Sequence, residues 1–343
     1  MQYRPLGKSG LLVSELCFGT MSFGKQGYWE LVGGLDQAAA QRLVDIALDA
    51  GVNFFDSADV YSHGQSEEVL GRALKGRREQ VVVATKVRGR MSAEINDVGL
   101  SRHHILKSCE ASLQRLGTDY LDLYIVHSFD FATPLEETLS ALNDLVRQGK
   151  VRYLGCSNFC AWQLMKALAV SEKHLWDKFV SLQAYYSLVA RDVELELAPL
   201  CEDQGLGLTP WSPLAGGFLT GKYPRGGQGP ADARRSKEQH NFIQIDDDKA
   251  YTILGEVQRI AAARGVSAAQ VALNYLLRKS PVSSVIIGAT KPAQLEDNLG
   301  TVAWTLTAEE IRALDAVSAP PRLYPHWMLE FTRLDRNNPA MLL

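Results

Sequence analysis

The chain lacks the features that mark several large classes of protein. Hydrophobic residues make up 46% of its 343 residues and charged residues 22%, which excludes collagen-like, low-complexity and globally disordered chains. Lys+Arg number 36 and Asp+Glu 39, so the net charge of -3 gives no reason to expect nucleic acid or an anionic membrane as a partner. No apolar run approaches the roughly 18 residues that a membrane-spanning helix needs. These absences predict a globular protein with a sizeable core.

Cysteine is also scarce, and its spacing indicates neither disulfides nor a metal site. The 5 cysteines are an odd number without a CxxC pair, and the opening MQYRPLGKSG has no apolar core of a signal peptide. Cys156 and Cys160 lie close in sequence, but no His or Cys cluster accompanies them to complete a zinc site, so we interpret them as packing residues. We expect a reducing, cytoplasmic setting and no metal.

Short β-rich runs alternate with amphipathic segments, which is the pattern of βα units and parallel strands. In the segment 36–50, small and aliphatic residues share one helical stripe, with Asp36 suited to the N-cap and Gly51 to the stop. Strands are predicted at 16–18, 52–55, 81–84, 121–126, 151–155, 180–183, 207–210 and 285–287. Helices are predicted at 36–50, 66–74, 101–116, 135–147, 161–170, 193–204, in two stretches around 250–278, and from Pro292 onward.

About eight β-runs are enough to close a parallel sheet, so we predict a single α/β domain over residues 1–343 with a (β/α)8 TIM-barrel fold. An open doubly wound sheet is the alternative, but no GxGxxG follows an early strand. The segment 224–248, rich in Gly, Arg and Asp, is predicted to be a long mobile loop after the seventh strand, either over a site or as a surface insertion. The aromatic-containing tail 320–343 is predicted to lie near the barrel mouth.

Four reactive side chains follow predicted strands, where active sites of such barrels lie. Asp56 ends the second strand and Tyr61 follows it, while Lys86 ends the third strand and His127 the fourth. Each alone is better explained by capping, packing or solvation than by catalysis. Together they form a tuned proton donor, because a tyrosine with a reference pKa of about 10 acts near neutrality when a nearby cation favours its phenolate. Lys86 supplies that cation, Asp56 keeps it charged and oriented, and His127 would polarise a carbonyl oxygen.

Six segments, spread in order over nearly the whole chain, carry a family resemblance: GVNFFDSADVYSHGQSEEVLGRAL, VVVATKV, YLDLYIVH, KVRYLGCSNF, TPWSPLAGGFLTGKY and VIIGATKPAQLEDN. Through them the sequence resembles the aldo-keto reductase superfamily, both its bacterial members and its branch of potassium-channel β subunits. The resemblance implies reversible NAD(P)H-dependent reduction of aldehydes or ketones to alcohols. In that reaction hydride leaves nicotinamide C4 while the tyrosine protonates the oxygen. It also implies a catalytic tetrad of Asp56, Tyr61, Lys86 and His127.

The same resemblance implies where the nicotinamide cofactor binds. Ser157, Asn158 and Gln183 would hydrogen-bond the carboxamide, and Trp211 would stack under the ring, where many relatives have tyrosine. The loop after Trp211 would wrap the pyrophosphate, and the helix N-terminus after the last strand would hold the adenosine end. The complete expected set is Gly19, Thr20, Met21, Asp56, Ser157, Asn158, Gln183, Trp211, Ser212, Leu214, Gly216, Lys222, Gly288, Thr290, Gln294 and Asn298.

The adenosine end departs from the family pattern. Many relatives have a cation at the position of Thr290, or two residues before it, to pair with the 2′-phosphate of NADPH, and this chain has none there. Gln294 is also uncharged where some members have arginine. Lys291, together with Arg234 or Arg235 of the long loop, would supply the missing charge. NADPH is therefore favoured, with NADH as the alternative.

The substrate side of the opening is predicted to be mostly apolar. The residues expected there are Met21, Trp29, Arg88, Phe129 and Trp327. They suit a moderately bulky apolar carbonyl compound or alcohol, although Arg88 would equally serve a carboxylate or sugar hydroxyls. No nucleic acid or membrane is expected as a partner, and the sequence does not indicate an oligomeric state.

Two other functions stay open at this point. A lysine at a strand end is also the residue that forms an imine in a Schiff-base lyase or aldolase, and Lys86 would be that lysine. The resemblance also admits a nicotinamide-binding regulatory subunit. Against this second alternative, the chain begins almost directly with the barrel, so that no separate partner-binding arm is expected.

Overall fold

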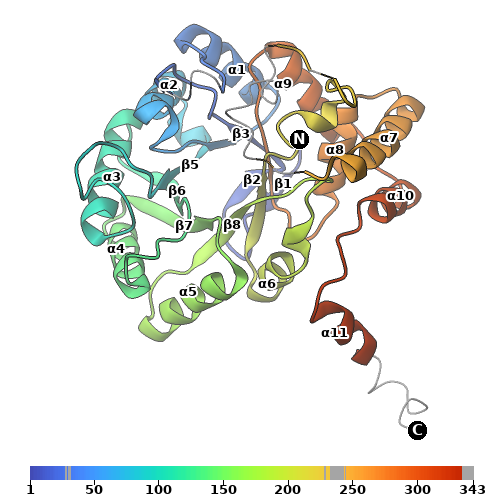
Figure 1. The fold of residues 1–343 in the computed structure, drawn as a ribbon. Coiled ribbons are helices and arrows are strands. Elements are labelled where there is room, and N and C mark those ends of the chain that lie inside the picture. The colour runs from blue at the N-terminus through green and yellow to red at the C-terminus, as the bar shows by residue number, and fades with distance from the viewer. Residues whose placement is uncertain (28, 30–31, 228, 232–242, 244, 334–343) are drawn as a thin grey trace.

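The protein is described by a computed structural model (Figure 1), which covers residues 1–27, 29, 32–227, 229–231, 243 and 245–333. Eight parallel strands form one sheet in the order β10-β3-β4-β5-β6-β7-β8-β9. Their bounds are β3 (Leu16–Gly19), β4 (Phe54–Asp56), β5 (Val82–Val87), β6 (Leu121–Val126), β7 (Val151–Ser157), β8 (Phe179–Tyr185), β9 (Gly207–Trp211) and β10 (Val285–Ile287). A parallel bridge between Leu208 and Val282 joins β9 to the segment before β10, so the sheet is a nearly closed barrel. The predicted (β/α)8 fold is confirmed.

Helices surround the barrel, as Figure 1 shows. They are α1 (Gln37–Asp49), α2 (Gln65–Ala73), α3 (Arg102–Leu116), α4 (Leu135–Arg147), α5 (Ala161–His174), α6 (Leu197–Gln204), α7 (Asp247–Arg264), α8 (Ala268–Leu277), α9 (Pro292–Leu299), α10 (Ala308–Ser318) and α11 (His326–Thr332). Asp36 caps α1 by accepting from the Ala39 backbone N–H, as its sequence position predicts. Within the described residues, every helix is too short or too polar to cross a lipid bilayer.

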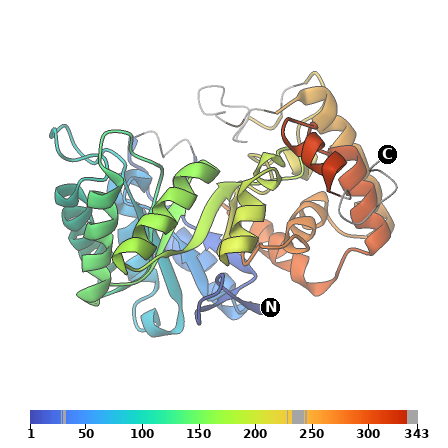
Figure 2. The same ribbon diagram turned by 90° about the horizontal axis from the view of Figure 1, so that it is seen from below.

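One β-hairpin and two α-helices of the fold are absent from the sequence prediction. Strands β1 (Tyr3–Pro5) and β2 (Leu12–Ser14) pair as an antiparallel hairpin before the barrel, and Figure 2 shows the amino terminus on the lower side of the molecule. Helix α10 begins with a capping box, in which Thr307 and Glu310 satisfy each other's backbone N–H groups. The T-x-x-E spacing was a usable signal for this helix. The third unpredicted element, α11, follows it in the tail.

Strand alternation sorts the core into two clusters and points the reactive residues inward. Phe54, Val82, Ala84, Leu123 and Ile125 pack together inside the barrel, whereas their chain neighbours pack outward against the helices. Because side chains alternate every second residue, the next inward position on each of these strands is Asp56, Lys86 or His127. The parallel register, with Asp56 beside Ala84 and Lys86 beside Ile125, brings these ends to one face of the barrel.

The loop and the tail are described only in part. Most of the segment predicted as a mobile loop, 224–248, lies outside the described residues. The described part of the tail forms α11, which Figure 1 shows beyond α10, away from the centre of the barrel. Its apolar side chains are exposed, with Trp327 at 44% and Phe331 at 66% of full exposure.

Candidate active site

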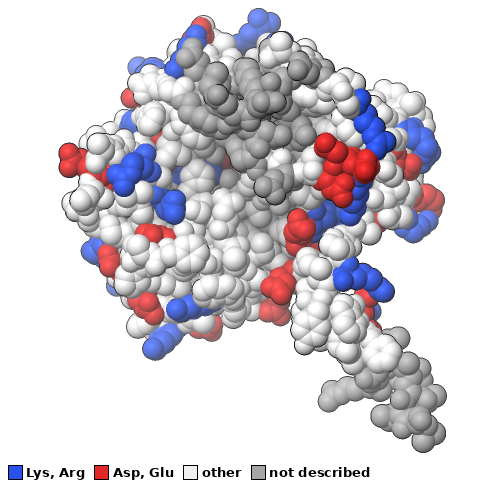
Figure 3. All heavy atoms as spheres, in the orientation of Figure 1, with Lys and Arg blue, Asp and Glu red and all other residues white. Residues whose placement is uncertain are grey.

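A cavity of about 910 Å³ opens where the barrel strands end. Asp56, Tyr61 and His127 contribute to its lining, together with the residues that follow β7, β8, β9 and β10. Figure 3 looks onto this face, which is hollowed near its centre and carries most of its visible charged side chains around the periphery. The position agrees with the rule that barrel enzymes place their sites at the carboxyl ends of the strands.

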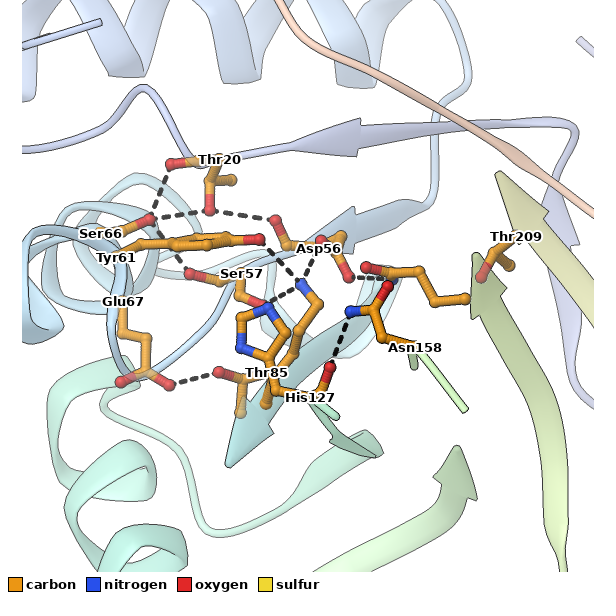
Figure 4. A network of polar contacts seen from close by, with 12 residues as sticks. Thr20, Asp56, Ser57, Tyr61, Ser66, Glu67, Thr85, His127, Asn158 and Thr209 are labelled. Atoms are coloured by element: carbon orange, nitrogen blue, oxygen red, sulfur yellow. Dashed lines mark hydrogen bonds and ion pairs between the residues drawn. The ribbon is translucent and has the colours of Figure 1, made fainter. Parts of the chain in front are cut away.

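The four predicted catalytic residues meet at the floor of this cavity (Figure 4). Lys86 Nζ donates to Asp56 Oδ1 at 2.5 Å and to the Ser57 carbonyl at 2.7 Å, and lies 3.4 Å from Tyr61 Oη. The Tyr61 ring packs edge to face against His127, with centroids 6.0 Å apart. Lys86 is fully buried and Tyr61 is 8% exposed, so the proton donor lies between a buried cation and the cavity.

The charge states of Lys86 and His127 follow from their surroundings. Burial is the largest influence on Lys86 and would lower its pKa, but Asp56 and then Tyr61 outweigh it, so the pKa of Lys86 is raised and the ammonium stays charged. For His127, burial, Lys86 and Arg88 all act in one direction and lower the pKa to about 3. The imidazole is therefore neutral at physiological pH, and it can donate a hydrogen bond without carrying a charge.

A second layer of polar residues holds the tetrad in place. Gln183 Nε2 donates to Asp56 Oδ2 at 2.8 Å, on the side of the carboxylate away from Lys86. Ser66 Oγ is 2.9 Å from Thr20 Oγ1 and 3.1 Å from Ser57 Oγ, which links three buried hydroxyls beside the tetrad (Figure 4). Thr20, expected on the cofactor, does not line the cavity and instead donates to the Asp56 carbonyl. Of this layer, only Thr20 and Gln183 were among the residues predicted for the site.

One end of the cavity has the polar groups that a nicotinamide carboxamide requires. Ser157 Oγ is buried and has no hydrogen-bond partner in the described structure. The Asn158 amide is fixed, because Nδ2 donates to the His127 carbonyl at 2.9 Å and Oδ1 accepts from Trp211 Nε1 at 3.2 Å. The Trp211 indole stacks on Tyr185 at 4.9 Å between centroids. An unsatisfied hydroxyl beside an oriented amide and a supported aromatic ring fits a planar carboxamide-bearing ligand.

The loop after β9 is a tight turn on the lining of the cavity. Ser212, Ala215, Gly216 and Gly217 all have positive φ, between 50° and 87°. The N–H groups of Ala215 and Gly217 donate to carbonyls of the loop and that of Gly216 donates to Ser212 Oγ, so the loop offers a ligand close backbone approach at its glycines. Lys222 also lines the cavity, and adding a Cβ to Gly217 would place it 2.8 Å from Lys222 Nζ. The loop and the lysine together fit a pyrophosphate.

The far end of the cavity is formed by β10 and α9. Both the backbone N–H and the hydroxyl of Thr290 donate to Gln294 Oε1, at 3.0 and 3.2 Å, so these two residues act as one unit. Lys291 lies on the lining beside them, and so does Asp297, which the sequence prediction missed. Arg234 and Arg235, expected to supply further charge, lie outside the described residues.

All predicted cofactor-binding residues except Thr20 line this one cavity. Comparison with known proteins agrees with that arrangement, because the family model "Aldo/keto reductase family" matches residues 15–319. The chain belongs to the aldo/keto reductase family.

Members of the aldo/keto reductase family that resemble this chain are named for different functions. A versiconal hemiacetal acetate reductase of Aspergillus parasiticus is 36% identical over 95% of this chain and 99% of its own length. A probable voltage-gated potassium channel subunit beta of Oryza sativa subsp. japonica is 41% identical, covering 94% of this chain and 98% of its own. An uncharacterized oxidoreductase of Bacillus subtilis, YrpG, is 38% identical over 94% and 97%. The chain is thus an oxidoreductase by family, while its relatives differ in substrate and role.

The substrate residues expected for this aldo/keto reductase are only partly brought together. Met21 and Trp29 line the cavity, and the Trp29 ring lies 5.1 Å from that of Tyr61. Phe129 packs instead against neighbouring aromatic rings, and Arg88 lies near enough to His127 to affect its charge without lining the cavity. Trp327 is on α11 and is also absent from the lining.

Proposed function

We propose that this chain is an NAD(P)H-dependent oxidoreductase that reduces aldehydes or ketones to alcohols, and catalyses the reverse reaction, with Tyr61 as general acid and base. The observation that carries the proposal is the Tyr61 hydroxyl, 3.4 Å from the fully buried Lys86 ammonium at the floor of a cavity of about 910 Å³. A proton donor beside a buried cation is what reduction of a carbonyl oxygen requires.

The bound nicotinamide would supply the hydride. The chain's own residues would transfer the proton to the substrate oxygen and stabilise the negative charge that develops. Tyr61 donates its proton to the substrate oxygen, and the charged Lys86 stabilises the phenolate that remains. Asp56 keeps Lys86 charged and in place. Neutral His127 donates a hydrogen bond to the same oxygen and orients the carbonyl. In the alcohol-oxidising direction the phenolate of Tyr61 takes the proton back.

The cofactor is proposed to extend from Ser157 and Asn158 at the tetrad, along the loop of Gly216 and Lys222, to Thr290. NADPH is favoured over NADH, and Lys291, on the lining beside Thr290, supports that preference as a source of positive charge for the 2′-phosphate. Cytoplasmic location is also part of the proposal, supported by five cysteines that are all free of disulfides.

The two alternative functions are less well supported by the geometry. An imine-forming lysine must lose its proton and meet the substrate, whereas Lys86 is fully buried behind Tyr61 and has a raised pKa. A regulatory role is supported by relatives from rice and Arabidopsis thaliana that are named as probable potassium channel subunits, and by no contact within the site. The presence of the complete tetrad favours catalysis.

The first test is a tryptophan-fluorescence titration of the purified protein with NADPH and, in parallel, with NADH, for which no substrate needs to be known. Saturable quenching is expected, with NADPH bound more tightly. Turnover is then measured with a panel of aromatic and aliphatic aldehydes. Failure of both nucleotides to bind would overturn the proposal, and binding without turnover of any carbonyl would favour the regulatory alternative.

Tyr61→Phe is the decisive variant. Removal of the proton donor should lower kcat by orders of magnitude while the affinity for NADPH changes little, because only the hydroxyl is lost. Near-normal turnover in this variant would show that another group protonates the substrate.

A further inference from the structure

A second cavity, of about 740 Å³, lies at the opposite end of the barrel from the active site. It is formed by β1, by the ends of α6 and α8, and by the segment leading to Ser283, all at the amino-terminal ends of the strands. Four of its lining residues are cationic, namely Arg4, Lys8, Arg278 and Lys279, and its acidic lining residue is Glu202.

Two of the four cations are already matched by carboxylates behind the lining. Arg4 donates to the carbonyls of Leu277 and Val282, at 3.0 and 3.2 Å, and to Glu15 Oε2 at 3.1 Å. Lys279 Nζ lies 2.7 Å from Asp315 Oδ1. These side chains are held by the protein itself and need no ligand.

Arg278 is a third cation of the lining, and a carboxylate matches it only in part. Its Nη2 is 3.9 Å from Glu15 Oε2, the same oxygen that accepts from Arg4, so one carboxylate is shared by two guanidinium groups. Its Nε is buried and has no hydrogen-bond partner in the described structure. Burial and the neighbouring Arg4 lower the pKa of Arg278, which shows that its charge is under-compensated. The Arg278 side chain is 26% exposed, so an anion in the cavity would contact the accessible part of the guanidinium and supply the counter-charge that Glu15 gives only in part.

Lys8 is held at the rim of the same cavity. Its backbone N–H donates to the Gly205 carbonyl at 2.7 Å, and its aliphatic stem lies so close to Gly205 that an added Cβ there would be 2.4 Å from Lys8 Cδ. The side chain makes no ion pair with any described residue. The stem of Lys8 therefore packs against Gly205 on the lining of the cavity.

We propose that this cavity is a binding site for a small multivalent anion carrying phosphate or clustered carboxylate groups, with Arg278 as the main ligand and Lys8 as the second. A guanidinium with free donors in a planar fork matches either oxyanion. Glu202, exposed on α6, opposes the anion and limits its affinity. The site is separate from the cofactor cavity and does not depend on the proposed reductase activity.

The test is isothermal titration of the whole protein with inorganic phosphate at constant ionic strength, repeated with citrate to separate the two oxyanion classes. Saturable binding of at least one of them is expected, weakened tenfold or more by Arg278→Met and several-fold by Lys8→Gln. Glu202→Gln should tighten it. Because Lys8 is exposed, Lys8→Gln stays informative if Arg278→Met does not fold.

A matched control separates this cavity from the pyrophosphate loop of the active site. Lys222→Met removes the cation of that loop and should leave unchanged the part of the phosphate titration that depends on Arg278 and Lys8. If Lys222→Met abolishes phosphate binding, or if Arg278→Met and Lys8→Gln both bind like the unmodified protein, the proposed site is wrong. Absence of saturable binding of both anions would also overturn it.

Discussion

Lys86 is a fully buried charged residue, and the contacts that its burial requires also determine its position beside Tyr61. A buried ammonium is costly unless it is paired and hydrogen-bonded, and here Asp56, the Ser57 carbonyl and Tyr61 take all three of its donors. The same contacts that keep Lys86 charged also aim it at the Tyr61 hydroxyl. The same hydrogen bonds therefore stabilise the buried Lys86 ammonium and hold it beside the Tyr61 hydroxyl. Experiments must separate the structural role of Lys86 from its catalytic role.

Lys86→Met is expected to lose both stability and turnover. It leaves the Asp56 carboxylate buried without its cation, which costs about 3–5 kcal/mol, and it removes the charge that stabilises the Tyr61 phenolate. The double variant Asp56→Asn/Lys86→Met removes the stranded charge and should recover part of the free energy of unfolding, measured with urea, without recovering kcat. Recovery of kcat together with stability would mean that Lys86 has only a structural role.

His127 should stay neutral over the whole working range of pH. Its pKa of about 3 lies below its unfolded value of about 6.5, so the unfolded chain binds a proton between these values that the folded chain does not. The contribution of His127 to stability is therefore intact above about pH 6.5 and is lost as the pH falls toward 3. Histidine NMR signals, assigned with His127→Gln, should show no titration of His127 between pH 8 and pH 5. A midpoint near 6.5 would contradict its neutrality.

The sequence predicted residues at strand ends better than the residues that support them. Asp56, Lys86 and His127 were accessible because strand alternation and barrel geometry place them without further information. Ser66 was not, because a serine early in a helix looks the same whether it faces solvent or completes a buried hydroxyl chain. The contact of Gln183 with Asp56 joins residues 127 positions apart, and a single sequence carries no signal for it.

At the scale of elements, long periodic segments and short apolar strands of the barrel were predicted well, whereas the strands of the hairpin were missed. Helix α4 and strand β6 have the predicted bounds, because a clear period and flanking breakers define them, and β10 has them because it is an uninterrupted apolar run. The three-residue strands β1 and β2 are too short to show any period. The predicted helix 193–204 is split, since its first residues form a 3-10 turn (Asp192–Glu194) before α6.

The backbone conformation of the loop after β9 is expected to determine how well this loop binds the cofactor. Gly217 has φ 87°, and a Cβ there would meet Lys222 Nζ at 2.8 Å. Gly217→Ala should strain the loop and displace Lys222, which is expected to weaken NADPH binding by about 1–3 kcal/mol. Gly226→Ala is the matched control, with φ 68° but open space around the added Cβ and no place on the cavity lining. Equal losses in both variants would assign the effect to general loop strain.

Over the whole molecule, the catalytic residues lie at one end of the barrel, and the hairpin that covers the core lies at the other end. The reactive groups lie at the carboxyl ends of the strands, while the hairpin of β1 and β2 delivers Leu6 and Val13 into the cluster inside the barrel, where both are fully buried. The layers of inward side chains between them are apolar and tightly packed. We therefore expect stability and activity to respond to substitutions at different ends.

Leu6→Ala tests this separation. Truncating a fully buried leucine at the amino-terminal end of the core leaves a cavity that neighbouring strands fill only partly, so the free energy of unfolding should fall by about 2–5 kcal/mol. Leu12→Ala, on the same hairpin but 55% exposed, should cost far less. Both variants should keep kcat/KM within a factor of two at 25 °C, because the tetrad is held by its own bonds to Ser57, Gln183 and Thr20 rather than by the hairpin. A drop in kcat/KM that follows the loss of stability in Leu6→Ala would show that the two ends of the barrel are coupled through its core.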